Sequence, residues 1–338
     1  MREFSIRENE AGQRLDKYLG KLLQNAPKSF CYKMLRKKNI TLNDKKASGS
    51  EKLDIGDVVR LYLSDETFRH FYGDDKEACP GAKPEKKMPS PEILYEDGDI
   101  LLVNKPAGIL SVPAKAGELS MLDVVTDYLL RSGAVRPEEL HTFHPAICNR
   151  LDQNTSGILA AGKTLAGLQA LSHAFREHRT DKRYLCLAAG ELTKEIHDQG
   201  YLDKDERQNK VTLYRDFAEG RSYIEAYFRP LCQGKGCTLM EAKLITGKPH
   251  QIRAALAGLG HPILGDTKYG NAKLNTLYRN KYALNRQLLH AYSLCFTDPE
   301  GILCRTGGRT FLARPGHRFE SILDREIPGW RETVHLAV

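Results

Sequence analysis

The strongest constraint on this chain is a dense turn-forming run that leads directly into an apolar segment. Residues 149–157 run Asn-Arg-Leu-Asp-Gln-Asn-Thr-Ser-Gly, and residues 158–161 run Ile-Leu-Ala-Ala. The apolar segment predicts a buried strand, and the polar run predicts the tight turn before it. A carboxylate on such a turn is both held and exposed to a substrate, so Asp152 is a candidate catalytic residue. In the alternative interpretation, Asp152 and its polar neighbours bond the local backbone and only shape the turn.

The composition is that of a globular protein with a basic excess. The 338 residues are 41% hydrophobic and carry a formal net charge of +8. This balance is compatible with a polyanionic partner but does not prove one. No apolar run approaches the ~20 residues of a membrane span, and the N-terminus lacks the apolar core of a signal peptide. We therefore expect a cytoplasmic protein without a membrane partner.

The cysteines predict free thiols rather than a metal centre. The eight cysteines are scattered, and no Cys-x-x-Cys pair occurs. Cys232 and Cys237 flank a Gln-Gly-Lys-Gly run that predicts a hairpin turn, and a zinc site there would lack a second pair of ligands nearby. We therefore expect no metal ion and a reducing compartment.

Residues 1–72 predict a small separate domain that begins with two helices. Apolar residues at helical spacing mark the first helix within residues 14–23. A second helix fits residues 29–38, with Ser29 as its expected N-cap and Asn39 as its expected left-handed terminator.

Two predicted strands and a basic stretch complete this domain. Residues 40–43 and 58–63 have strand-like patterns. Between residues 28 and 46, seven lysines and arginines face a single acidic residue. Such a run is either a solvated helix face or a surface that follows phosphate groups. The candidate phosphate-binding residues here are Lys33, Arg36, Lys37 and Lys38.

The rest of the chain predicts a linker and an α+β domain. Residues 73–91 are polar and rich in proline, as in a flexible or extended linker. Residues 92–338 contain many strand-like segments, with helices expected at 122–132, 164–177 and 250–259. Strands dominate, so we expect an α+β fold with a largely antiparallel sheet.

Two later motifs join the turn motif in a specific order. Residues 246–253 run Thr-Gly-Lys-Pro-His-Gln-Ile-Arg, and residues 260–266 run Gly-His-Pro-Ile-Leu-Gly-Asp; residues 182–184 give a Lys-x-Tyr between them and the turn. Together these motifs resemble the RluA-type family of RNA pseudouridine synthases, from about residue 93 to about residue 296. The order of elements in the N-terminal unit resembles the small RNA-binding domain of ribosomal protein S-four, which often precedes this catalytic domain.

The resemblance implies an isomerase that converts uridine in RNA into pseudouridine. That reaction breaks the bond from ribose C1′ to N1 and joins C1′ to C5, with no redox step and no cofactor. The chain likewise has no Walker loop and no dinucleotide fingerprint. Large-subunit ribosomal RNA is the expected substrate, transfer RNA is the alternative, and a monomer is expected. The resemblance makes Asp152 the essential catalytic group, as nucleophile or through a glycal intermediate.

The resemblance also assigns roles to other side chains. A carboxylate in a closed pocket tends toward its neutral form, and Arg253 would keep Asp152 ionised through two hydrogen bonds. Tyr184 would stack on the target base. Arg150 would fill the gap that the base leaves when it flips out of the RNA. Candidate phosphate contacts are Lys182 and Lys248.

Departures from the family pattern concern the target site rather than the catalytic groups. Asn149 stands where a histidine is usual, Lys248-Pro249 replaces an Arg-Thr, and Ala255 replaces a common histidine. Four further motif residues are interpreted as structural: His250, His261, Asp266 and His290.

Two other classes of function remain as alternatives. A non-catalytic RNA-binding or ribosome-assembly factor would need only the N-terminal unit, and has no reason to retain Asp152, Tyr184 and Arg253 together. A nucleoside or glycoside hydrolase that used Asp152 would need a second carboxylate at a defined separation, and no motif supplies one.

Overall fold

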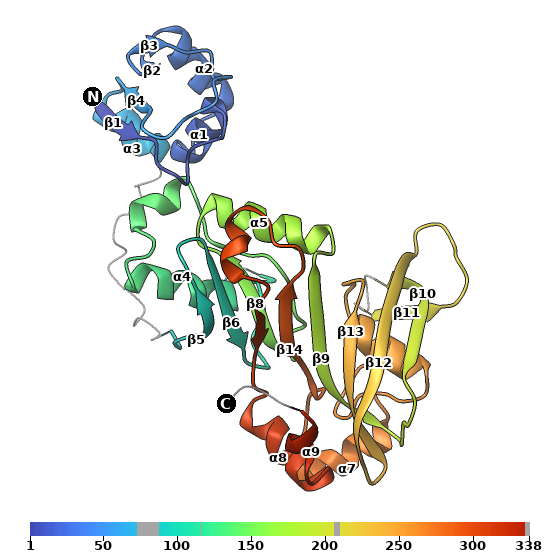
Figure 1. The fold of residues 1–338 in the computed structure, drawn as a ribbon. Helices are drawn as coiled ribbons and strands as arrows, with labels where there is room; N and C mark the ends of the chain where they lie inside the picture. The colour runs from blue at the N-terminus through green and yellow to red at the C-terminus, as the bar shows by residue number, and fades with distance from the viewer. Residues whose placement is uncertain (73–87, 116, 206–209, 335–338) are drawn as a thin grey trace.

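The computed structural model describes residues 1–72, 88–115, 117–205 and 210–334 (Figure 1). Residues up to 72 form an antiparallel sheet with strand order β1-β4-β2-β3, packed against helices. Leu15, Leu19, Leu35, Ile40 and Val59 belong to a buried apolar cluster of this unit alone. The elements are β1 Arg2–Ser5, α1 Leu15–Leu22, α2 Lys28–Arg36, β2 Ile40–Leu42, β3 Lys45–Lys46, β4 Val58–Leu61 and α3 Asp65–Tyr72.

The ends of α2 differ from the expectation. Its N-cap is Pro27, with no capping side chain, so Ser29 lies inside the first turn. Lys38, with φ of 58°, takes the left-handed position expected for Asn39. The amide of Asn39 instead donates to the carbonyl of Met34 at 2.9 Å, as in a Schellman closure. The helix therefore ends at Arg36, two residues before the expected end at Lys38, and the left-handed residue comes one position earlier than expected.

The remaining residues build an eleven-stranded sheet among the described residues, so the α+β prediction is confirmed. Its strand order is β11-β10-β12-β13-β9-β14-β8-β6-β5, with β15 beside β14 and β7 beside β8. Neighbouring strands are antiparallel except β14 and β8, which run parallel. The strands are β5 Glu92–Glu96, β6 Ile100–Lys105, β7 Ala146–Ile147, β8 Ser156–Gly162, β9 Thr180–Ala189, β10 Ile196–Asp205, β11 Lys210–Tyr214, β12 Ser222–Gly234, β13 Cys237–Leu244, β14 Leu289–Phe296 and β15 Thr310–Leu312.

Helices cover both faces of this sheet. Leu159 on β8 belongs to the apolar cluster of α4, whereas its neighbour Ile158 belongs to the cluster of α5 on the opposite face. Tyr184 packs against both the α4 cluster and the α6 cluster, so these two helices share a face. The helices are α4 Met121–Arg131, η1 Pro137–His141, α5 Leu165–Arg176, α6 Gln251–Gly258, α7 Ala272–Tyr282, η2 Gly301–Thr306, α8 His317–Glu326 and α9 Trp330–Thr333.

The parallel pairing of β8 with β14 depends on a glycine. Gly157 lies opposite Ala291 and has φ of 120°. A Cβ atom at this position would overlap the backbone nitrogen and carbonyl of Ala291. Only glycine allows both this backbone angle and this close approach.

The N-terminal unit touches the large sheet domain through a few polar and aromatic contacts. The hydroxyl of Thr142 donates to buried Glu10 at 2.7 Å, and Tyr72 stacks on His141 with ring centroids 4.3 Å apart. Most of the expected linker, residues 73–87, lies outside the described residues, and residues 88–91 lead into β5.

Candidate active site

The loop of residues 148–155, here the Asp152 loop, connects β7 to β8 and is pinned at alternate positions. The side-chain amide of Asn149 donates to the carbonyl of Ile158 at 3.1 Å and accepts from the amide of Ala160 at 2.8 Å. The backbone N–H and C=O of Leu151 both bond the hydroxyl of Ser111, at 3.0 and 2.9 Å. Asn149 thus makes structural contacts at the position where a histidine was expected.

A buried lysine holds the third anchor point. The Lys105 side chain is fully buried, and its Nζ donates to the carbonyl oxygens of Pro106, Ile109 and Gln153 at 2.8–3.0 Å. Burial lowers the pKa of Lys105 to about 7, while the charge of Asp152 acts in the opposite direction. Gly108 adds a hydrogen bond of 2.8 Å from its amide to the carbonyl of Gln153. The backbone next to Asp152 is therefore fixed by two hydrogen bonds to the carbonyl of Gln153, from Lys105 and from Gly108.

Arg253, on the first turns of α6, lies between two carboxylates. Its Nη1 donates to Oδ2 of Asp152 at 2.7 Å. Its Nε and Nη2 donate to the two oxygens of Asp266 at 2.7 and 2.9 Å. The two-point pairing expected with Asp152 was wrong: it is made with Asp266, and Asp152 receives one hydrogen bond. Asp152 keeps its second oxygen for other partners.

Burial makes this pairing electrostatically strong. Asp266 is fully buried, whereas the Asp152 side chain is 24% exposed. Burial alone would raise the pKa of Asp266, but Arg253 and the backbone amides of Lys268 and Tyr269 hold it below its ordinary value. Burial likewise opposes the charged form of Arg253, yet the two carboxylates keep its pKa above the ordinary value. The guanidinium therefore stays charged beside Asp152.

A second set of groups lies on the other side of Asp152. The hydroxyl of Tyr269 accepts the amide of Val211 at 2.8 Å and lies 2.9 Å from Nδ1 of His250. Burial lowers the pKa of His250, which favours a neutral ring that accepts the tyrosine proton at Nδ1. Its Nε2 then carries the proton and lies 3.9 Å from Oδ1 of Asp152. His250 has φ of 54°, a left-handed conformation that few non-glycine residues adopt.

Tyr184 occupies the face of the sheet between α4 and α6. It is half-buried, on β9, and paired across the ladder with Ala242 of β13. Burial raises the pKa of Tyr184, and the nearby charge of Asp152 adds to that effect. Its hydroxyl is therefore neutral at physiological pH, and Tyr184 lies close enough to Asp152 for the charge of that carboxylate to act on it.

The remaining predicted binding residues lie at the surface or close to it. Arg150 and Lys248 are exposed. Lys182 is half-buried, and burial lowers its pKa. Its Nζ lies 3.5 Å from where a Cβ of Gly247 would be, so Lys182 points toward the Thr-Gly-Lys-Pro turn. The four basic residues at the end of α2 are all exposed: Lys33, Arg36, Lys37 and Lys38.

Sequence reasoning missed three contributors to the site. Asp266 was interpreted as turn chemistry, yet it orients Arg253; the Gly-Asp at the end of a motif was the available signal. Tyr269, three residues beyond that motif, bonds His250, and its ring centre lies 5.1 Å from Cζ of Arg253. Lys105 was not singled out in the sequence, and its position before Pro106 was the only local signal. Among the described residues, no cluster of three or more potential metal ligands occurs, and no helix could span a membrane.

A partly exposed carboxylate, held by a buried arginine that also pairs with a second carboxylate, is typical of an enzyme active site. Comparison with known proteins gives the same class. Residues 99–258 match the family model described as RNA pseudouridylate synthase. "Ribosomal large subunit pseudouridine synthase C" of Haemophilus ducreyi is 31% identical over 95% of this chain and 94% of its own. The enzyme of the same name from Escherichia coli K12 is 31% identical over 87% of this chain and 88% of its own.

A solved structure supports the fold. The human "RNA Pseudouridylate Synthase Domain Containing 4" aligns with a TM-score of 0.54 and 20% identity, over 69% of this chain and 92% of its own. The chain therefore belongs to the RNA pseudouridine synthase family, a group of isomerases that act without gain or loss of atoms.

Proposed function

We propose that this protein isomerises uridines of large-subunit ribosomal RNA to pseudouridine, with Asp152 as the catalytic group. Curated relatives that are 31–32% identical carry names that state this substrate. Transfer RNA is the alternative substrate of the same chemistry. The protein acts as a monomer in the cytoplasm, where ribosomal RNA is available.

The carboxylate of Asp152 acts at C1′ of the target ribose. One oxygen receives the hydrogen bond from Arg253, and the other lies on the side of His250. The pairing with Arg253 favours the ionised form, which a nucleophile or a stabiliser of positive charge at C1′ requires. After the C1′–N1 bond breaks, the base turns within the pocket and C5 bonds to C1′. The proton on C5 then passes to a base, and N1 gains one, so the atoms of the uridine balance.

Two side chains accommodate the flipped base: one stacks on it, and the other fills the gap that it leaves in the RNA. Tyr184 offers a neutral, half-buried ring on which uracil stacks before and after it turns. Exposed Arg150, two residues before Asp152, enters the RNA where the target base leaves its stack. Lys182 and Lys248 contact phosphates near the target nucleotide.

Residues 1–72 act as the RNA-binding domain and residues 92–338 as the catalytic domain. Exposed Lys33, Arg36, Lys37 and Lys38 form one basic surface at the end of α2. Such a surface binds RNA through its phosphates, independently of sequence.

The observation that carries the proposal is the 2.7 Å hydrogen bond from Arg253 to Asp152, braced by Asp266. The test is to map pseudouridine across total RNA in cells that lack the gene and carry either the wild-type or the Asp152→Asn copy. Restoration of particular ribosomal sites by the wild type, but not by Asp152→Asn, is the expected result. Asp127→Asn on α4 removes one partly exposed carboxylate; it is the matched control and should restore these sites.

Other outcomes would change the assignment. Sites lost only from transfer RNA would retain the chemistry and replace the substrate. Full rescue by Asp152→Asn would contradict the catalytic role and favour a factor that acts through binding alone. Purified enzyme with RNA transcripts of the affected sites then separates direct modification from an indirect effect.

A further inference from the structure

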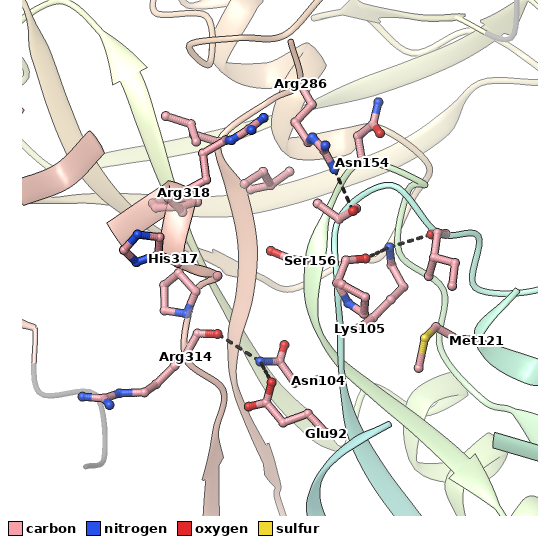
Figure 2. Close-up of a pocket in the computed structure, with 18 of the residues that line it drawn as sticks. Glu92, Asn104, Lys105, Met121, Asn154, Ser156, Arg286, Arg314, His317 and Arg318 are labelled. Carbon is pink, nitrogen blue, oxygen red and sulfur yellow. Dashed lines mark hydrogen bonds between the residues drawn. The ribbon is translucent and has the colours of Figure 1, made fainter. Parts of the chain in front are cut away.

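A cavity of about 540 Å³ lies beside the Asp152 loop (Figure 2). Lys105 at the end of β6 and Ser156 at the start of β8 line one side, and the segments before β14 and at the start of α8 line the other. Its volume is within the ~300–1,000 Å³ that ligand sites commonly have. The cavity shares Lys105 with the support of the Asp152 loop, but Asp152, Tyr184 and Arg253 are not among its lining residues, so it does not open onto the reacting groups.

The walls of the cavity are mainly apolar. Met121 and Val124 on α4 contribute from one side, and Leu288 and Phe319 contribute from the other. All four side chains belong to buried clusters of the protein, so their positions are fixed by packing. A ligand that enters would bury apolar surface against a preformed wall, which favours binding.

Positive charge is concentrated at one end of the cavity. Figure 2 shows Arg286 and Arg318 at one end, and Glu92 with Asn104 at the other. Arg286 donates from Nη1 to the carbonyl of Ala107 at 2.7 Å, which leaves further N–H groups of its guanidinium as donors. Two neighbouring guanidinium groups suit a carboxylate or a phosphate.

The acid at the opposite end is already engaged. The carboxylate of Glu92 accepts a hydrogen bond from the side-chain amide of Asn104 at 3.1 Å. The arrangement therefore has an apolar middle, a cationic end, and an acidic end whose exposed carboxylate already accepts a hydrogen bond. A molecule with an anionic head and an apolar body complements the cationic end and the apolar middle.

We propose that this cavity is a second binding site, which takes a small organic oxyanion with an apolar body. The carboxylate or phosphate head lies between Arg286 and Arg318, and the body packs against Val124 and Phe319. This site is independent of the uridine reaction and of the RNA substrate.

The test uses calorimetric titration of the full-length protein with two probes of the same shape. 2-Naphthoate carries the anionic head, and 2-naphthamide lacks the charge. We expect 2-naphthoate to bind with a Kd of about 100 μM or tighter, and 2-naphthamide to bind at least about tenfold more weakly, because a charged hydrogen bond contributes ~1.5–3 kcal/mol.

Two arginine variants distinguish a direct contact with the anionic head from a long-range effect of positive charge. Arg318→Gln should weaken 2-naphthoate at least about fivefold and leave 2-naphthamide unchanged. Arg314 also lines the cavity, but its side chain extends away from it in Figure 2, so Arg314→Gln is the matched control and should change neither probe. Val124→Trp should fill the cavity and abolish the binding of both probes.

Three results would overturn the proposal. One is the absence of saturable binding of 2-naphthoate to the wild-type protein. A second is an equal loss of affinity in Arg314→Gln and Arg318→Gln, which would indicate only a diffuse charge effect. The third is competitive displacement of 2-naphthoate by a fragment of ribosomal RNA, which would place the cavity in the path of the RNA. Even if Val124→Trp fails to fold, the two arginine variants decide between these results.

Discussion

Asp152 and Asp266 bond opposite edges of one guanidinium group, that of Arg253. Asp266, which is buried, accepts two hydrogen bonds, and Asp152, which is partly exposed, accepts one. Asp266 therefore fixes the orientation of the guanidinium group, and with it the direction in which Nη1 of Arg253 donates to Asp152. The position of the candidate catalytic carboxylate depends on a residue more than a hundred positions later in the chain.

The first prediction concerns Asp266→Asn. The amide cannot accept both N–H groups of Arg253, so we expect Arg253 to lose its alignment and the single-turnover rate to fall by about tenfold or more. Breaking a buried ion pair should also cost ~3–5 kcal/mol of unfolding free energy, measured in urea. Asp127→Asn, which breaks the exposed pair with Arg131, should cost less than ~1 kcal/mol and leave the rate unchanged. A destabilised variant with an unchanged rate would limit Asp266 to stability.

The second prediction concerns the pH dependence of stability. Burial lowers the pKa of Lys105 to about 7 from an ordinary 10.5, so between these values the unfolded chain binds more protons than the folded protein. Stability from this group should therefore rise with pH across that window, by up to ~1.4 kcal/mol per pH unit, and be absent below pH 7.

Lys105→Met removes the titrating group and gives the comparison. Its unfolding free energy should be lower at every pH, because three carbonyl oxygens lose their donor. The informative quantity is the slope of unfolding free energy between pH 7 and pH 10, which should be smaller than in the wild type. Equal slopes would mean that Lys105 keeps its proton in the folded protein throughout this range.

The third prediction concerns Gly157. In Gly157→Ala the new methyl group meets the backbone of Ala291, which cannot move without separating β8 from β14. We expect a loss of about 4 kcal/mol or more, or no folded protein. Gly220 also has positive φ, at 85°, but has open space around it, so Gly220→Ala should cost only ~1 kcal/mol. Similar losses in both variants, by denaturant unfolding, would contradict the steric explanation.

The fourth prediction concerns the basic surface on α2. We expect glutamine at all four positions to weaken RNA binding and to reduce the slope of log affinity against log salt by up to about 3. The positions are Lys33, Arg36, Lys37 and Lys38. A control with the same change of charge replaces four exposed cations elsewhere: Lys194, Lys235, Lys273 and Arg279. An unchanged salt slope in the α2 variant, measured by filter binding, would rule out this surface as the RNA contact.

The α+β class and the helices of the large domain could be predicted because their signals are local. The expected helices at 122–132 and 164–177 are observed as α4, Met121–Arg131, and α5, Leu165–Arg176. The hairpin between Cys232 and Cys237 is also present, with Gly234 paired to Cys237. Periodicity and turn composition are sufficient for such elements.

The details of the site could not be predicted because they depend on contacts between distant segments. The division of Arg253 between two carboxylates needs the position of Asp266 in space. A fully buried lysine such as Lys105 is rare, and its carbonyl partners come from two separate loops. The left-handed residue after α2 is Lys38 and not Asn39, although asparagine prefers that conformation. The hydrogen bond from the amide of Asn39 to the carbonyl of Met34 determines this position.

Residues of the Asp152 loop alternate between two roles. Asn149, Leu151 and Gln153 bond the scaffold. The side chain of Arg150 is exposed, and that of Asp152 accepts from Arg253. Inserting or deleting one residue here would exchange the two groups and remove the reacting carboxylate from its place. Substituting an anchor would only move that carboxylate. The geometry of this loop therefore constrains its length more tightly than it constrains the identity of the anchors, because only a change of length moves Asp152 to the scaffold-bonding side.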